Sequence, residues 1–103
     1  MALPPRDHRI SLEDAAALTR RYRDEAGKGA ERAGAFHAGQ VSELLAEKGC
    51  VGLRIYYGKH EDGRDALILV GVDADDKDLT GGMVLNFQYP CPPYCGDGSP
   101  LNS

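Results

Sequence analysis

The sequence contains no tryptophan, two phenylalanines and no long apolar run. No stretch approaches the roughly 18 consecutive apolar residues that a membrane-spanning helix requires, so we expect no membrane partner. The opening residues, MALPPRDHRI, lack the apolar core of a secretory signal. Together these two absences predict a cytoplasmic protein.

Basic residues are also scarce. The chain has 12 Lys and Arg against 16 Asp and Glu, which gives a formal net charge of −4. The one basic cluster, Arg20, Arg21 and Arg23, is followed at once by Asp24 and Glu25. Proteins that bind a phosphate backbone usually present a broader basic face. We therefore expect no nucleic-acid partner.

Cysteines number three, and an odd count does not suit a framework of disulfides, because one thiol is left over. This count favours a reducing compartment, in agreement with the predicted cytoplasmic location.

A length of 103 residues is typical of one domain. Pro4 and Pro5 oppose helix formation, so residues 1–10 are predicted to be an extended N-terminal lead. Residues 11–89 are predicted to form a single α+β domain. The remaining residues, 90–103, are rich in Pro, Cys and Gly and are named here the C-terminal strap.

The first predicted helix begins at Ser11, whose hydroxyl can accept a hydrogen bond from an early helical amide. Apolar and small residues then recur at three- and four-residue steps, as an amphipathic helix requires. These positions are Leu12, Ala15, Ala16, Leu18, Thr19, Tyr22 and Ala26. Gly27 and Gly29 are predicted to end the helix.

A second helix is predicted from about Gln40, after a glycine-rich connection at residues 27–39 that shows no clear period. The spacing of Val41, Leu44 and Leu45 supplies its apolar face. Gly49 is predicted to cap its end.

After Gly49 the apolar period changes to two, which predicts strands. Residues 51–57 form the first strand, an Asp62-Gly63 hairpin loop follows, and residues 66–72 form a central second strand. Residues 83–89 form a third, stopped by Pro90. The predicted fold class is therefore α+β, with two helices packed on one face of a three-stranded antiparallel sheet, followed by an extended Pro-rich C-terminal segment.

Two surfaces are predicted to take part in interactions. Arg54 and Tyr56 fall on the second face of the first strand, and this mixture of polar and aromatic side chains is typical of interfaces. In the strap, Tyr94 and Leu101 are candidate anchors, since a Pro-rich segment loses little entropy on docking. The leading hypothesis is a non-enzymatic module without a cofactor that forms a homo-oligomer or binds another protein.

Cys91 and Cys95 have the spacing C-x₃-C across two prolines. A polyproline II segment would hold their Cα atoms about 12 Å apart, which is too far for a disulfide unless the chain turns back. The alternative hypothesis is a zinc site or thiol-redox site formed by Cys91, Cys95 and Cys50, with His60 or His37 as a further zinc ligand. A small enzyme with a reactive cysteine is a third hypothesis, tested by thiol alkylation.

The acidic segment DADDKD, residues 73–78, resembles a calcium loop in composition alone. Lys77 occupies the third ligand position and Val84 occupies the twelfth, where an EF-hand has Glu. A solvated acidic turn is predicted instead.

Four segments, GCVGLRIYYG (49–58), LVGVD (69–73), PCPPYC (90–95) and SPLNS (99–103), together resemble a family of small uncharacterised bacterial proteins. The likeness covers most of the chain from Ser11 onward. It implies a bacterial single-domain protein, and it implies no activity, ligand or catalytic residue.

Overall fold

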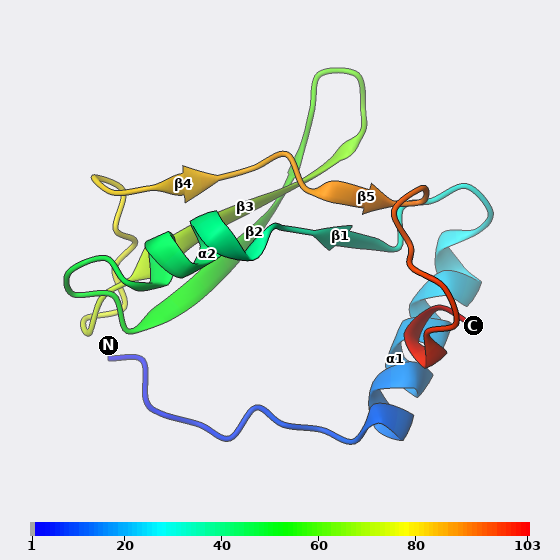
Figure 1. The fold of residues 1–103 in the computed structure, drawn as a ribbon, viewed down its shortest axis with the longest axis horizontal. Coiled ribbons are helices and arrows are strands. Elements are labelled where there is room, and N and C mark those ends of the chain that lie inside the picture. The colour runs from blue at the N-terminus through cyan, green and yellow to red at the C-terminus, as the bar shows by residue number, and fades with distance from the viewer. Residues whose placement is uncertain (1) are drawn as a thin grey trace. The chain divides into compact units, whose positions relative to one another are not determined.

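The computed structural model describes residues 2–103 (Figure 1). The chain divides into two compact units. The sheet unit contains Phe36–Gln88 and the described residues up to Pro5, and the helix unit contains Arg6–Ala35 and Tyr89–Ser103. The predicted α+β class is confirmed, with two helices and a three-stranded antiparallel sheet.

Three antiparallel strands form the sheet, in the order β2-β3-β4. They are β2 (Gly52–Lys59), β3 (Asp65–Val72) and β4 (Val84–Leu85). The central place of β3 confirms the prediction from its nearly continuous apolar run. Leu69 on β3 lies opposite Ile55 on β2 and opposite Leu85 on β4, and this register fixes which side chains share a face.

The loop between β2 and β3 turns at the predicted Asp62-Gly63 pair. Gly63 has a φ of 92°, a conformation that favours glycine, and its N–H donates to the carbonyl of His60. The N–H of His60 in turn donates to the carbonyl of Arg64 at 2.9 Å, which closes the hairpin.

Helix α2 (Ala38–Leu45) packs on β3 and supplies the core of the sheet unit (Figure 1). It starts two residues before the predicted Gln40, because the ring of His37 caps it by accepting a hydrogen bond from the N–H of Gly39 at 3.2 Å. The buried core consists of Leu44, Leu69 and Leu85, with Phe36, Val41, Leu67 and Met83 packed around it. The helix ends before the predicted Gly49, which lies in the turn that follows.

In the helix unit, helix α1 (Leu12–Ala26) has the predicted limits. The Ser11 hydroxyl accepts a hydrogen bond from the N–H of Asp14 at 3.0 Å, and Gly27, with a φ of 83°, donates to the carbonyl of Arg23. Ala16 is buried, and α1 packs against the short 3₁₀ helix η1 (Pro100–Asn102). Among residues 2–103, neither helix combines the length and the apolar composition that a membrane span requires.

The predicted third strand at residues 83–89 is wrong in its extent. Phe87 has a φ of 61°, which an extended strand does not allow, so β4 ends at Leu85. Further along, Tyr89–Cys91 form a separate strand, β5, which pairs antiparallel with β1 (Ala33–Ala35) in the helix unit. The connection at residues 27–39 therefore contains a strand that its irregular pattern did not predict.

Candidate interaction surface

Strand β2 forms one edge of the sheet. It pairs with β3 along one side, and from Gly52 to Gly58 no described strand pairs with its outer side. An edge strand presents unpaired backbone N–H and C=O groups, and soluble proteins usually keep such strands short or place charges and prolines on them. β2 is eight residues long and contains no proline, and its two charged residues, Arg54 and Lys59, are paired with aspartates of the same chain. Its outer side is therefore a template for a further strand.

The open face of β2 is apolar. Leu53, Ile55 and Tyr57 lie opposite Gly71, Leu69 and Leu67 and so share the face on which α2 packs. Their exposed fractions are 37%, 49% and 92%, so α2 leaves this part of the face uncovered. The sequence predicts a half-buried strand with these residues on one face, and the structure shows that face to be largely exposed. The reason is that α2 is short and packs over β3.

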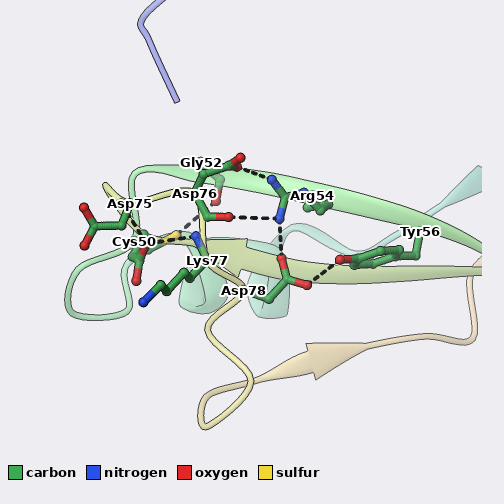
Figure 2. Close-up of polar contacts among 9 residues, drawn as sticks. Cys50, Gly52, Arg54, Tyr56, Asp75, Asp76, Lys77 and Asp78 are labelled. Carbon is green, nitrogen blue, oxygen red and sulfur yellow. Dashed lines mark hydrogen bonds and ion pairs between the residues drawn. The ribbon is translucent and has the colours of Figure 1, made fainter. Parts of the chain in front are cut away.

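The other face of β2 presents Arg54 and Tyr56, the two residues predicted there. Arg54 donates to the Asp78 carboxylate at 2.6 Å and also to the Asp76 carboxylate. The Tyr56 hydroxyl donates to the second oxygen of Asp78 at 2.5 Å. Figure 2 shows the guanidinium between the two carboxylates, with the phenol pointing toward Asp78. These four residues are named the Arg54 cluster.

The segment that supplies the two carboxylates is ordered by its own hydrogen bonds. Asp73 accepts from the N–H groups of Asp75 and Lys77 through one carboxylate oxygen, at 2.8 and 3.0 Å. Asp76 has a φ of 66°, which turns the chain, and Asp78 then bridges to Val72 at the end of β3. The predicted solvated acidic turn is thus wrong for Asp76 and Asp78, which are partly buried against Arg54.

Hydrogen bonding within the cluster fixes its charge state. The Tyr56 hydroxyl, with a further contribution from Arg54, lowers the pKa of Asp78, while the same carboxylate raises the pKa of Tyr56. Asp78 and Asp76 together raise the pKa of Arg54. At neutral pH Asp78 is therefore ionised, the Tyr56 phenol is protonated and Arg54 is charged. Arg54 is held in one conformation, and its charge is neutralised by its neighbours.

The face with the Arg54 cluster is also covered further along the sheet. The side chain of Leu3 lies against Gly52, and Val70 and Val72 are buried beneath this face. Strand β2 thus has one face held by the Arg54 cluster, on which Tyr56 is still 45% exposed, and one apolar face that α2 leaves open.

The other two predicted interface residues, Tyr94 and Leu101, lie in the helix unit. Arg23 of α1 donates to the carbonyl oxygens of Leu101 and Ser103 at 2.7 and 2.5 Å, so the strap is tied to α1. The ring of Tyr94 lies 5.0 Å from that of Tyr89. A hollow of about 440 Å³ beside α1 has Tyr94 and Leu101 in its wall. Both side chains therefore line this hollow and also reach solvent.

The sequence predicts that Cys91 and Cys95 can bond only if the chain turns back, and the structure contains that turn. The two residues form a disulfide with a Cα–Cα distance of 4.7 Å. The estimate assumed an extended segment, but the chain turns back after β5, closed by a hydrogen bond of 2.8 Å from the N–H of Tyr94 to the carbonyl of Pro90. The peptide bonds before Pro92 and Pro93 are both cis. Cys91 is buried, so the bond is shielded from solvent on that side.

The residues of the alternative zinc site are divided between the two units. Cys50 is a free thiol in the sheet unit, where its Sγ donates to the carbonyl of Gly52 at 3.2 Å. His60 lies in the hairpin loop, with its ring stacked 6.1 Å from that of Phe87. The other two predicted ligands are bonded to each other in the helix unit. Within residues 2–103, no group of three or more His, Cys, Asp or Glu side chains is placed to hold a metal ion.

Comparisons with models of protein families, with curated proteins and with solved structures found no match to this chain. The resemblance to a family of small bacterial proteins therefore stays a prediction. What can be inferred about function comes from the geometry of the two units, and the open edge of β2 is the most distinctive feature of that geometry.

Proposed function

We propose that the protein is a non-enzymatic interaction module that self-associates through strand β2. The observation that carries the proposal is an edge strand whose outer side is paired by no described strand from Gly52 to Gly58 and whose apolar face is open. Addition of a second strand satisfies the backbone groups of the edge and covers the apolar side chains in one step.

Burial of the apolar face supplies the driving force. Leu53 and Ile55 are already partly buried, so covering what is exposed of each stabilises the complex by roughly 1 kcal/mol, and Tyr57 contributes more because it is nearly fully exposed. The backbone hydrogen bonds add to this and set the orientation of the strands. Arg54 loses little freedom on association, because Asp76 and Asp78 already hold it.

A second copy of the chain is the partner that fits the strand best. In the segment GLRIYYG, Gly52 and Gly58 lie at equal distances from Ile55, as do Leu53 and Tyr57 on the open face and Arg54 and Tyr56 on the other face. A two-fold interface brings the same patch of each copy together, so it requires this kind of self-complementarity. The segment 51–59 contains Arg54 and Lys59 but no acidic residue, so it offers no carboxylate to a basic partner strand.

The predicted cytoplasmic location stays part of the proposal. In a reducing compartment the Cys91–Cys95 disulfide is open to reduction. That bond belongs to the helix unit and β2 to the sheet unit, so we expect self-association in both redox states.

Light scattering after size-exclusion chromatography tests the proposal. The parent protein is expected at twice its chain mass of 11.1 kDa, in a concentration-dependent equilibrium. Ile55→Lys places a charge in the apolar face and is expected to yield the single-chain mass. Val84→Lys is the matched control, because Val84 is 53% exposed on the opposite edge strand, and it is expected to keep the parent mass.

A parent protein that stays at 11.1 kDa at every accessible concentration contradicts the proposal. The proposal is also contradicted if Ile55→Lys and Val84→Lys dissociate the dimer equally, because the contact then does not depend specifically on β2. Circular dichroism of each variant establishes that the comparison is made between folded proteins.

A further inference from the structure

We infer that two copies join their β2 strands in antiparallel orientation about a two-fold axis that passes through Ile55. Leu53 of one copy then lies opposite Tyr57 of the second copy, and Arg54 lies opposite its Tyr56. This inference rests on the proposed function, because it specifies the geometry of the same contact. It goes beyond that proposal because it specifies which residues of the two β2 strands lie opposite each other.

Backbone geometry restricts the choice first. Along a strand, the N–H and C=O groups of alternate residues point to the same side, so the outward groups of β2 belong either to its odd-numbered or to its even-numbered residues. Hydrogen-bonded pairs between two copies must both come from that outward set. The two residue numbers in such a pair therefore add to an even number. The axis must pass through a residue and cannot pass between two residues.

Three axes near the middle of the strand satisfy this condition, at Arg54, Ile55 and Tyr56. An axis at Arg54 pairs only residues 52–56 of β2 with those of the second copy, whereas an axis at Ile55 pairs residues 52–58. An axis at Tyr56 places Leu53 opposite Lys59 and so leaves an apolar residue facing a charged one. The first of these axes leaves Tyr57 without a partner residue within β2, and the second leaves Leu53 opposite a charge.

The axis at Ile55 avoids both faults. On the open face, the apolar residues of one copy, Leu53, Ile55 and Tyr57, continue directly into those of the second. On the face of the Arg54 cluster, each Arg54 lies opposite Tyr56 of the second copy, so no two arginines face each other. Gly52 faces Gly58 at each end, so no side chain obstructs the close approach of the strands.

The Arg54 cluster supports this register in a further way. Tyr56 is held by Asp78 of its own copy, so its ring is oriented before association. Arg54 is neutralised by Asp76 and Asp78, so two copies can approach without an unpaired cation at the joint. The cluster thus prepares both members of each expected Arg54–Tyr56 pair.

Disulfide trapping tests the register. Arg54→Cys, Ile55→Cys and Tyr56→Cys are made singly in a Cys50→Ser background, in which serine retains the hydrogen-bond donor of the free thiol and the Cys91–Cys95 bond stays closed. Residues directly opposite each other have Cα atoms about 4.5–5.5 Å apart, within the range of a disulfide. A residue two positions out of register is about 8 Å from its copy, beyond that range.

Under mild oxidation, Ile55→Cys is expected to yield a covalent dimer, while Arg54→Cys and Tyr56→Cys alone yield little. Mixing the last two is expected to produce the covalent dimer, because these positions face each other in the inferred register. The mixed pair Leu53→Cys and Tyr57→Cys provides a second readout of the same register if one of the first variants folds poorly.

Self-trapping at position 54 or 56 in place of 55 overturns the register and leaves the proposed self-association standing. A dimeric mass without trapping at any of these positions overturns the register as well, because the contact then lies elsewhere. A single-chain mass for the parent, with no trapping, overturns the proposed function itself.

Discussion

The two edge strands of the sheet differ in length and in protection. β4 has two residues and ends before Phe87, whose positive φ takes the chain out of the sheet. At the other edge, β2 has eight residues and continues without a bulge or a proline opposite β3. Short and interrupted edges are a common defence against unwanted strand pairing. One edge of this sheet has that defence and the other does not, which is why we assign the interaction to β2.

Helix α2 covers only part of the sheet face on which it packs. Leu44 of α2 is fully buried and packs with Leu69 of β3 and Leu85 of β4. Ile55, directly opposite Leu69, is 49% exposed. Neighbouring residues on one face are thus expected to differ sharply in how much they stabilise the single folded chain.

The largest loss of stability is expected from a substitution in the part of this face that α2 covers. Leu44→Ala should lower the free energy of unfolding by about 3 kcal/mol, because a fully buried leucine leaves a cavity. Ile55→Ala is expected to cost about 1 kcal/mol or less at dilutions where the mass is that of one chain, because half of its side chain is already in water. Urea unfolding at low protein concentration measures both. Similar losses for the two variants would show that Ile55 belongs to the single-chain core.

A smaller change in the free energy of unfolding is expected from a substitution in the Arg54 cluster. Comparing it with a substitution on the open face of β2 tests the difference between the two faces. Tyr56→Phe removes the hydrogen bond to Asp78 and should lower stability at neutral pH, whereas Tyr57→Phe, at a side chain 92% exposed, should change little. The lowered pKa of Asp78 contributes stability above pH 3.8 that is lost as the pH falls through the folded value. The raised pKa of Tyr56 contributes stability below pH 10.0 that is lost as the pH rises through the folded value.

The difference in stability between the parent and Tyr56→Phe is therefore expected to be largest between these limits and to shrink outside them. Urea titrations at several pH values measure this profile. A difference that stays constant into strongly acidic solution would exclude Asp78 as the partner that gives Tyr56 its effect.

Local signals in the sequence were sufficient for α1 and for the β2–β3 hairpin. The hydroxyl of Ser11 and the flexible backbone of Gly27 act within one turn of the helix, so they can be read without knowledge of the rest of the fold. The Asp62-Gly63 pair acts in the same way for the hairpin. The central position of β3 followed from its apolar composition.

Long-range pairings were not predictable from local patterns. β1 is a strand because β5 lies beside it, and its own sequence, AGA, has no strand signal. The Cys91–Cys95 disulfide depends on a turn that an extended-chain estimate omits. The β1–β5 pairing is set by contacts distant in sequence, for which residue spacing carries no information, whereas the disulfide joins residues four apart and depends on a local turn.

The candidate site was predicted in part. Arg54 and Tyr56 were found from their alternation along β2, but their partners Asp76 and Asp78 were assigned to solvent. The available signal was that Asp76 and Asp78, like Arg54 and Tyr56, are two residues apart, so both pairs can lie on one face of the sheet. That signal depends on knowing that residue 78 returns to the edge of β3.

Hydrogen–deuterium exchange of the backbone amides of β2, at low and high protein concentration, tests the central claim most directly. If two copies pair through this edge, the outward amides of residues 52–59 exchange more slowly as the concentration rises, while the exchange of Val84 and Leu85 at the opposite edge does not change. Exchange in β2 that is the same at all concentrations, in a protein shown by mass to associate, would place the contact on another surface and contradict the account.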